Sequence, residues 1–232
     1  MATVDVLRVF STRDGTGGNP LGVVLYGAQV PVESRQQVAA DLGFSETVFV
    51  DDPATGQVQI FTPKVELPFA GHPLVGTAWL LGKMDQAVDT LRPPAGEVPT
   101  WSDDRGLQWI RGRAEWVPEI AFRQYPSPSD VEGLTEAPDG LGFVEAWSWA
   151  DEAAGVIRAR VFASDVGIPE DEATGAAAVR LVTELDRPIE VRQGQGSVIL
   201  ARPGPDGTAE IGGRCTIAET RDQPVPPAPS AA

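Results

Sequence analysis

The chain has 232 residues, and 42% of them are hydrophobic, which is enough for one large domain or two small ones with a buried core. Its 33 acidic and 18 basic residues give a formal net charge of −15, and this negative field argues against nucleic acid or an anionic membrane surface as a partner. The single cysteine, Cys215, excludes an intrachain disulfide and any chemistry that needs two thiols.

Several other classes are disfavoured by what the sequence lacks. No apolar run is long enough to cross a bilayer, and the first residues do not pair a basic segment with a hydrophobic one, so we expect a cytoplasmic protein without a membrane partner. One histidine and one distant cysteine do not supply the usual metal ligands. The glycine-rich segments 15–22 and 194–197 lack the remaining residues of phosphate and dinucleotide loops, so we expect no cofactor.

Most of the chain consists of short runs in which apolar and polar residues alternate, a pattern that predicts half-buried antiparallel strands. In chain order these runs are 4–10, 21–27, 47–52, 57–63, 107–112, 114–122, 142–149, 155–163, 189–194, 197–203 and 209–219. Only three segments, 31–43, 73–82 and 174–186, predict helices. The first should lie on a surface, whereas the other two are apolar around most of their first turns and should be enclosed on nearly all sides.

Each enclosed helix has strands before and after it, so the chain repeats one plan twice. We expect an α+β fold with two pseudo-symmetric lobes, each a curled, mostly antiparallel and barrel-like β-sheet around a central helix. The first lobe should comprise residues 1–98 and a C-terminal strand at about 214–220, and the second residues 99–213. The proline- and glycine-rich segment 91–106 is the candidate crossing between them, and residues 221–232 should be a disordered tail.

The only histidine, His72, stands between Gly71 and Pro73 at the start of an enclosed helix. Pro73 suits the first helical position, so we predict that His72 is the N-cap, where free backbone N–H groups and the helix dipole attract an anion. The residues alone leave open whether His72 only caps the helix or takes part in catalysis.

Carboxylates stand at two further positions of interest. Glu46 lies at the head of an apolar strand, where it is either solvated or, if it faces the gap between lobes, raised in pKa towards neutrality as a proton-shuttling base requires. Asp171 lies in an acidic triplet just before Thr174 and Gly175. Acidic residues favour a helix N-terminus in any case, but the bare backbone after Thr174 also allows the close approach of a ligand.

Four blocks of sequence together carry a resemblance to a known family. They are GGNPLGVVL (17–25), SETVFV (45–50), FTPKVELPFAGHPLVGTAWLL (61–81) and GIPEDEATGAA (167–177). In this order they resemble the phenazine-biosynthesis isomerase, or PhzF-like, family, and the similarity extends more weakly to 192–202 and 211–219. The resemblance implies a diaminopimelate-epimerase-like fold whose active site lies between two lobes, with both central helices pointing their N-termini into it.

The resemblance also implies roles for individual residues. The family's catalytic glutamate, histidine and aspartate fall on Glu46, His72 and Asp171. Its carboxylate-binding backbone amides fall on the Gly71 and His72 pair and on the Gly175 and Ala176 pair. The full set of predicted substrate-binding residues is Ser45, Gly71, Pro73, Thr174, Gly175, Ala176 and Gly194. No metal site is expected.

The function implied is a cofactor-independent isomerase that moves a proton on a small cyclic carboxylate resembling trans-2,3-dihydro-3-hydroxyanthranilate, by general acid–base catalysis. Two-cysteine racemisation is excluded, because Ala70 and Ala173 stand near the positions of the thiols in the related racemases. Many family members have a serine where this chain has Ala176, and the second lobe is short. These departures leave two alternatives open: a non-catalytic small-molecule-binding or partner protein, or another isomerase or cyclase of secondary metabolism. We expect a homodimer.

Overall fold

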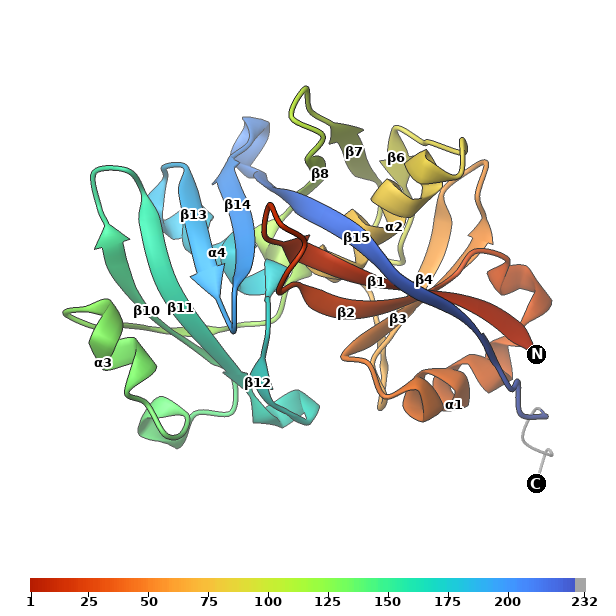
Figure 1. Cartoon of the computed structure of the whole chain (residues 1–232), viewed down its shortest axis with the longest axis horizontal. Helices are drawn as coiled ribbons and strands as arrows, with labels where there is room; N and C mark the ends of the chain where they lie inside the picture. Colours follow the sequence, from red (N-terminus) through yellow and green to blue (C-terminus); the bar gives the residue numbers. More distant parts are fainter. Residues whose placement is uncertain (228–232) are drawn as a thin grey trace.

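The computed structural model describes residues 1–227, and β-strands dominate it (Figure 1). The strands of the first half are β1 (Ala2–Ser11), β2 (Asn19–Val24), β3 (Glu46–Asp52), β4 (Gln57–Phe61), β5 (Glu66–Leu67), β6 (Thr90–Leu91), β7 (Val98–Ser102) and β8 (Gln108–Gly112). Those of the second half are β9 (Ala121–Gln124), β10 (Val144–Asp151), β11 (Val156–Ala163), β12 (Ile168–Asp171), β13 (Ile189–Gln193), β14 (Ser197–Pro203) and β15 (Ala209–Gln223).

All the strands belong to one mixed, mostly antiparallel sheet, which is not closed into a barrel. Its main path runs β5, β4, β3, β2, β1, β15, β14, β13, β11, β10, β9, with β12 added beside β11 and the β8, β7, β6 branch added beside β15. The long strand β15 connects the two lobes, because its first half pairs with β14 and β8 and its second half pairs with β1 (Figure 1). The α+β fold class predicted from the sequence is confirmed.

Within residues 1–227, four α-helices accompany the sheet: α1 (Val32–Leu42), α2 (Gly71–Lys83), α3 (Pro128–Glu132) and α4 (Gly175–Leu185). The prediction of only three helices was wrong, because α3 has five residues and no apolar period, although Ser127 and Asp130 form a capping box that signals its start. Helix α2 is enclosed as predicted. Helix α4 is less enclosed than predicted, since Thr183 and Glu184 are exposed on its outer side.

The segment that was predicted to cross between the lobes contains a strand. Segment 91–106 was predicted as the crossing from its proline and glycine content, but it contains β7, and the β7–β8 hairpin packs against α2. Most of the proline and glycine residues of this segment lie in the turns on either side of β7. We therefore propose that the first lobe ends near Gly112 rather than at residue 98, and that residues 113–120 cross to β9.

The strand at the C-terminal end starts where the run 209–219 predicted it and extends four residues further, to Gln223. Ala2 pairs with Gln223, so residues 221–223, predicted to be part of a disordered tail, extend β15 beside β1. The last part of that predicted tail, 228–232, lies outside the described residues. No helix within residues 1–227 is long and apolar enough to span a bilayer.

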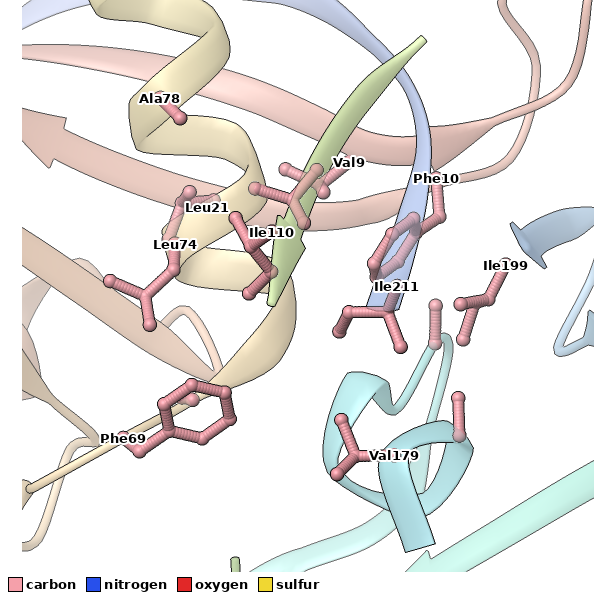
Figure 2. Packing of buried hydrophobic residues seen from close by; sticks show 14 of the residues in the cluster. Val9, Phe10, Leu21, Phe69, Leu74, Ala78, Ile110, Val179, Ile199 and Ile211 are labelled. Atoms are coloured by element: carbon pink, nitrogen blue, oxygen red, sulfur yellow. The ribbon is translucent and has the colours of Figure 1, made fainter. Parts of the chain in front are cut away.

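One hydrophobic cluster joins the two lobes. Figure 2 shows Leu74 of α2, Val179 of α4 and Ile211 of β15 within the same packed cluster, and all three are essentially inaccessible to solvent. Ile211 lies at the centre, close to the first residues of both helices, Gly71 and Gly175. Burial of this cluster therefore fixes how the two helices meet.

Candidate active site

The N-termini of α2 and α4 meet at a cavity of about 420 Å³ between the lobes. A methyl group added to Gly175 would lie 2.9 Å from the Cα atom of Gly71, and one added to Gly71 would lie equally close to the Cα atom of Gly175. Real Cβ atoms do not approach other atoms so closely, so both positions require glycine. Backbone therefore packs on backbone where the two helices begin.

Helix α2 begins two residues earlier than predicted. The N–H of Leu74 donates to the carbonyl of Ala70 at 3.3 Å, so Ala70, with an extended backbone, is the N-cap and His72 is the second helical residue. Pro73 is tolerated there because the first-turn N–H groups of a helix have no intrahelical acceptor. Helix α4 begins at Gly175 with Thr174 as its N-cap.

Backbone N–H groups are available at both helix starts. Gly71 and His72 from α2, and Gly175 and Ala176 from α4, all line the cavity. No residue of the described chain supplies a hydrogen-bond acceptor to these four N–H groups. Free N–H groups and the positive ends of two helix dipoles together make a site for an anion.

Glu46, the first residue of β3, projects into this cavity and is mostly buried. Burial raises the pKa of its carboxyl to about 7, against a smaller lowering by a hydrogen bond from Ser45. Its Oε2 atom lies 3.4 Å from Nε2 of His72, and neither atom has a hydrogen-bond partner in the described chain. Such a carboxyl can both release and accept a proton near neutral pH.

His72 is buried and neutral at pH 7, because burial lowers the pKa of its imidazole to about 4. The charge of Asp171 and a hydrogen bond to the backbone carbonyl of Pro20 oppose that shift only in part. Since Nε2 faces Glu46, the bond to Pro20 falls to the other ring nitrogen. In this tautomer Nε2 is an acceptor aimed at the carboxyl of Glu46.

Asp171 ends β12 on the opposite side of the cavity. Burial raises the pKa of its carboxyl to about 6, and repulsion by Glu46 adds to this, while His72 and hydrogen bonds from Thr174 and Asn19 lower it. Oδ1 accepts from Asn19 Nδ2 at 2.7 Å, and Oδ2 accepts from Thr174 Oγ1 at 2.6 Å. Both oxygens of Asp171 are therefore bonded to the protein, unlike Oε2 of Glu46.

Two amide side chains at the site were missed from the sequence. Asn19 bonds Asp171, and Gln193 accepts the Thr174 N–H at 3.0 Å and donates to the Asp171 carbonyl at 2.8 Å. Asn19 stands in the first of the four motif blocks, which was a usable signal. No sequence signal pointed to Gln193, because it fits the alternating burial pattern of β13 like any other strand residue.

The remaining predicted binding residues divide into two groups. Thr174 and Ala176 line the cavity, whereas Ser45 and Pro73 stand just outside it. Gly194 lies in a separate polar hollow, where an added Cβ would lie 2.2 Å from Oε2 of Glu172. The geometry therefore gives Gly194 a packing role and no contact with a molecule in the cavity.

Apart from Thr62, the rest of the cavity wall is apolar, and it carries no lysine or arginine. Phe69 and Trp116 are in contact, with ring centroids 5.7 Å apart, and the crossing segment supplies Trp116 to the cavity. Within residues 1–227, no group of three His, Cys, Asp or Glu side chains is placed to hold a metal ion. Cys215 lies buried in β15 and does not line the cavity.

Comparisons with solved structures give the same fold. A putative phenazine biosynthesis PhzC/PhzF protein from Clostridium difficile superposes with a TM-score of 0.76 at 17% identity, covering 96% of this chain and 99% of that one. A probable proline racemase from Agrobacterium radiobacter superposes with a TM-score of 0.65 at 11% identity, covering 98% of this chain and 94% of that one. At these identities the likeness shows the fold alone.

Sequence comparisons give the family. The model of the phenazine biosynthesis-like protein family matches residues 7–112. The trans-2,3-dihydro-3-hydroxyanthranilate isomerase of Pseudomonas fluorescens is 31% identical over 221 residues, covering 79% of this chain and 80% of the relative. The isomerase of the same name from Pseudomonas aeruginosa is 30% identical over 227 residues, with the same coverage of both chains. This chain is therefore a member of the phenazine biosynthesis-like, or PhzF-like, family of isomerases.

Proposed function

We propose that this protein is a cofactor-independent isomerase that moves a proton between two carbons of a small cyclic substrate bearing a carboxylate. The observation that carries the proposal is the placement of Glu46. Its buried carboxyl, which titrates near pH 7, stands 3.4 Å from a neutral imidazole at a cavity where two helix N-termini meet. General acid–base catalysis works best with a group whose pKa lies near the working pH.

The substrate carboxylate binds to the backbone N–H groups of Gly71, His72, Gly175 and Ala176. These donors are fixed in position by the helices, so no reorganisation is needed when charge develops on the bound molecule. Ala176 lacks the hydroxyl of the serine that many family members have at this position, but its backbone N–H is retained. The apolar wall around Phe69 and Trp116 suits an uncharged ring.

In the reaction the ionised carboxylate of Glu46 removes a proton from a ring carbon, and the electron pair of the broken C–H bond enters the conjugated system. The same carboxyl then delivers a proton to a second carbon of that system, so atoms and electrons balance without an oxidant or reductant. Between the two steps, protonated Glu46 donates to Nε2 of His72. This bond holds the acid in position.

The test follows the migrating proton. With trans-2,3-dihydro-3-hydroxyanthranilate in heavy water, wild-type protein should incorporate deuterium at the carbon that receives the proton, measured by NMR. Glu46→Gln should lower this rate by about 10²–10⁴-fold, because the amide cannot act as a base. The exposed Glu33→Gln serves as the control and should keep the wild-type rate.

Two outcomes would contradict the proposal. An active Glu46→Gln variant would remove Glu46 from the mechanism. Binding of the carboxylate, measured by thermal shift, with no deuterium exchange in wild-type protein would favour a non-catalytic binding protein.

We also propose a homodimer. The strands at both ends of the main sheet path, β5 and β9, leave backbone hydrogen-bonding groups available for a second copy. Analytical ultracentrifugation measures the mass in solution, and a monomer at micromolar concentration would reject this assembly.

A further inference from the structure

Two carboxyl groups line the same buried cavity, and their mutual repulsion favours a proton on one of them. The proposed function requires that Glu46 be the group that takes up and releases a proton, whereas Asp171 stays ionised throughout. The residue types alone do not decide which of the two groups carries the proton, because aspartic and glutamic acid have similar ordinary pKa values. The surroundings of the two groups must differ.

One such difference is Asn19, which donates a hydrogen bond to Asp171 and none to Glu46. It is the first residue of β2, its side chain is buried, and all its polar atoms have partners. Its Nδ2 donates to Oδ1 of Asp171 at 2.7 Å and to the carbonyl of Ala173 at 2.9 Å, and its Oδ1 accepts from Ser45 Oγ at 3.3 Å. The Asp171 carboxylate and the Ala173 carbonyl are both acceptors, so the end of the Asn19 amide that faces them is the NH₂ group.

These contacts join the two carboxyl groups across the lobes. Asn19 belongs to the first lobe, whereas Asp171 and Ala173 belong to the second, and Ser45 directly precedes Glu46. We infer that Asn19 is a positioning residue that holds Asp171 in its ionised form and fixed orientation, so that the exchangeable proton remains on the Glu46 side of the cavity. Its amide donates to Asp171 and makes no hydrogen bond to Glu46.

No other group in the described chain replaces this donor. The charges that act on Asp171 are those of Glu46 from β3 and His72 from α2. Glu172, which lines the neighbouring polar hollow with Asp171, accepts from the Gln195 N–H and Ser197 Oγ. The nearby arginines of β11 are directed elsewhere, since Arg160 pairs with Glu170 and Arg158 pairs with Glu132. Thr174 supplies the second donor, but its hydroxyl also accepts from Gln193 and belongs to the same lobe as Asp171.

The first test is independent of catalysis. Carboxyl ¹³C NMR of aspartate-labelled protein, with Asp171→Asn used to assign the signal, gives the titration of Asp171 in the free protein. Asn19→Leu should raise its midpoint by about 1 pH unit, because a hydrogen bond to a charged group is lost. Gln108→Leu removes an equally buried amide far from the cavity and should leave the midpoint unchanged.

The second test rests on the proposed function. In the deuterium assay, Asn19→Leu should lower kcat by about 10–100-fold with KM changed little, and should move the pH profile. Asn19→Ser keeps one hydroxyl donor, packs with less strain if the leucine variant does not fold, and should recover part of the loss.

An unchanged Asp171 midpoint in both Asn19 variants would overturn the inference. An equal midpoint shift in Gln108→Leu would overturn it as well. If no deuterium exchange is seen in wild-type protein, the proposed function fails, while the NMR titration still decides the role of Asn19.

Discussion

The two helix starts that meet at the cavity differ in how well their polar groups are satisfied. At the start of α2, Oε2 of Glu46 and Nε2 of His72 are buried without a hydrogen-bond partner in the described chain. At the start of α4, both oxygens of Asp171 and the N–H of Thr174 are bonded. One start therefore keeps reactive groups available, and the other holds a charge in place.

This difference has an energetic meaning. A buried polar atom without a partner costs about 1–3 kcal/mol, so most proteins avoid it except where function requires it. The first lobe carries two such atoms within 3.4 Å of each other. The second lobe supplies the fixed geometry in which these atoms can act on a bound molecule.

The largest effect expected from this comparison is the pH dependence of catalysis. Glu46 must be ionised to remove a proton, and burial raises its pKa to about 7, so kcat/KM should fall about tenfold per pH unit below that value and level off above it. At pH 5 the rate should be about 100-fold below the plateau. Deuterium exchange measured from pH 5 to 9 gives the profile, and a flat profile would contradict the base assignment.

A change at the contact between the helix starts should cost stability. In Gly175→Ala the new methyl group would lie 2.9 Å from Cα of Gly71 and 3.0 Å from Cδ1 of Ile211, so we expect a loss of about 2–4 kcal/mol in the free energy of unfolding. Gly82→Ala in α2 meets nothing within 4 Å and should instead gain about 0.5–1 kcal/mol. Urea denaturation measures both. Equal stabilities would mean that the helices do not meet as described.

A smaller effect concerns a second carboxyl with unpartnered oxygens, which lies away from the cavity. Burial raises the pKa of Glu145 in β10 from its ordinary 4.5 to about 8, and the charge of Glu184 adds to this. The folded state therefore binds more protons than the unfolded state between those values, so stability should fall as pH rises through this window.

Glu145→Gln should remove that fall, so its stability relative to wild type should rise by about 3–4 kcal/mol from pH 5 to pH 8. The exposed Glu184→Gln is the matched control and should have a much smaller effect. Thermal unfolding at both pH values tests this pair. A wild-type protein equally stable at pH 5 and pH 8 would argue against a buried neutral carboxyl.

The sequence predicted the fold class, the two long central helices and the family, because these depend on local periodicity and on short motifs. The motifs also directed attention to Glu46, His72 and Asp171, which the structure brings to one cavity. Whether they catalyse remains a prediction. Their burial, which sets their pKa values, is a tertiary property that no local pattern contains.

What the sequence could not give depends on contacts between distant residues. Asn19 and Asp171 are 152 positions apart, and Gly71 and Gly175 require glycine only because the two helices meet. Segment 91–106 includes the hairpin strand β7, because proline and glycine mark a hairpin turn as readily as a linker. Helix α3 was missed because one capping box in a short segment carries little signal.

The long strand β15 has a consequence for how the molecule comes apart. Because it pairs with β14 and β8 at one end and with β1 at the other, neither lobe has a complete sheet without it. An isolated segment 1–112 would lack the neighbour that covers β1 and would expose that edge to aggregation. The protein should accordingly melt as a single cooperative unit, despite the internal repetition of its architecture.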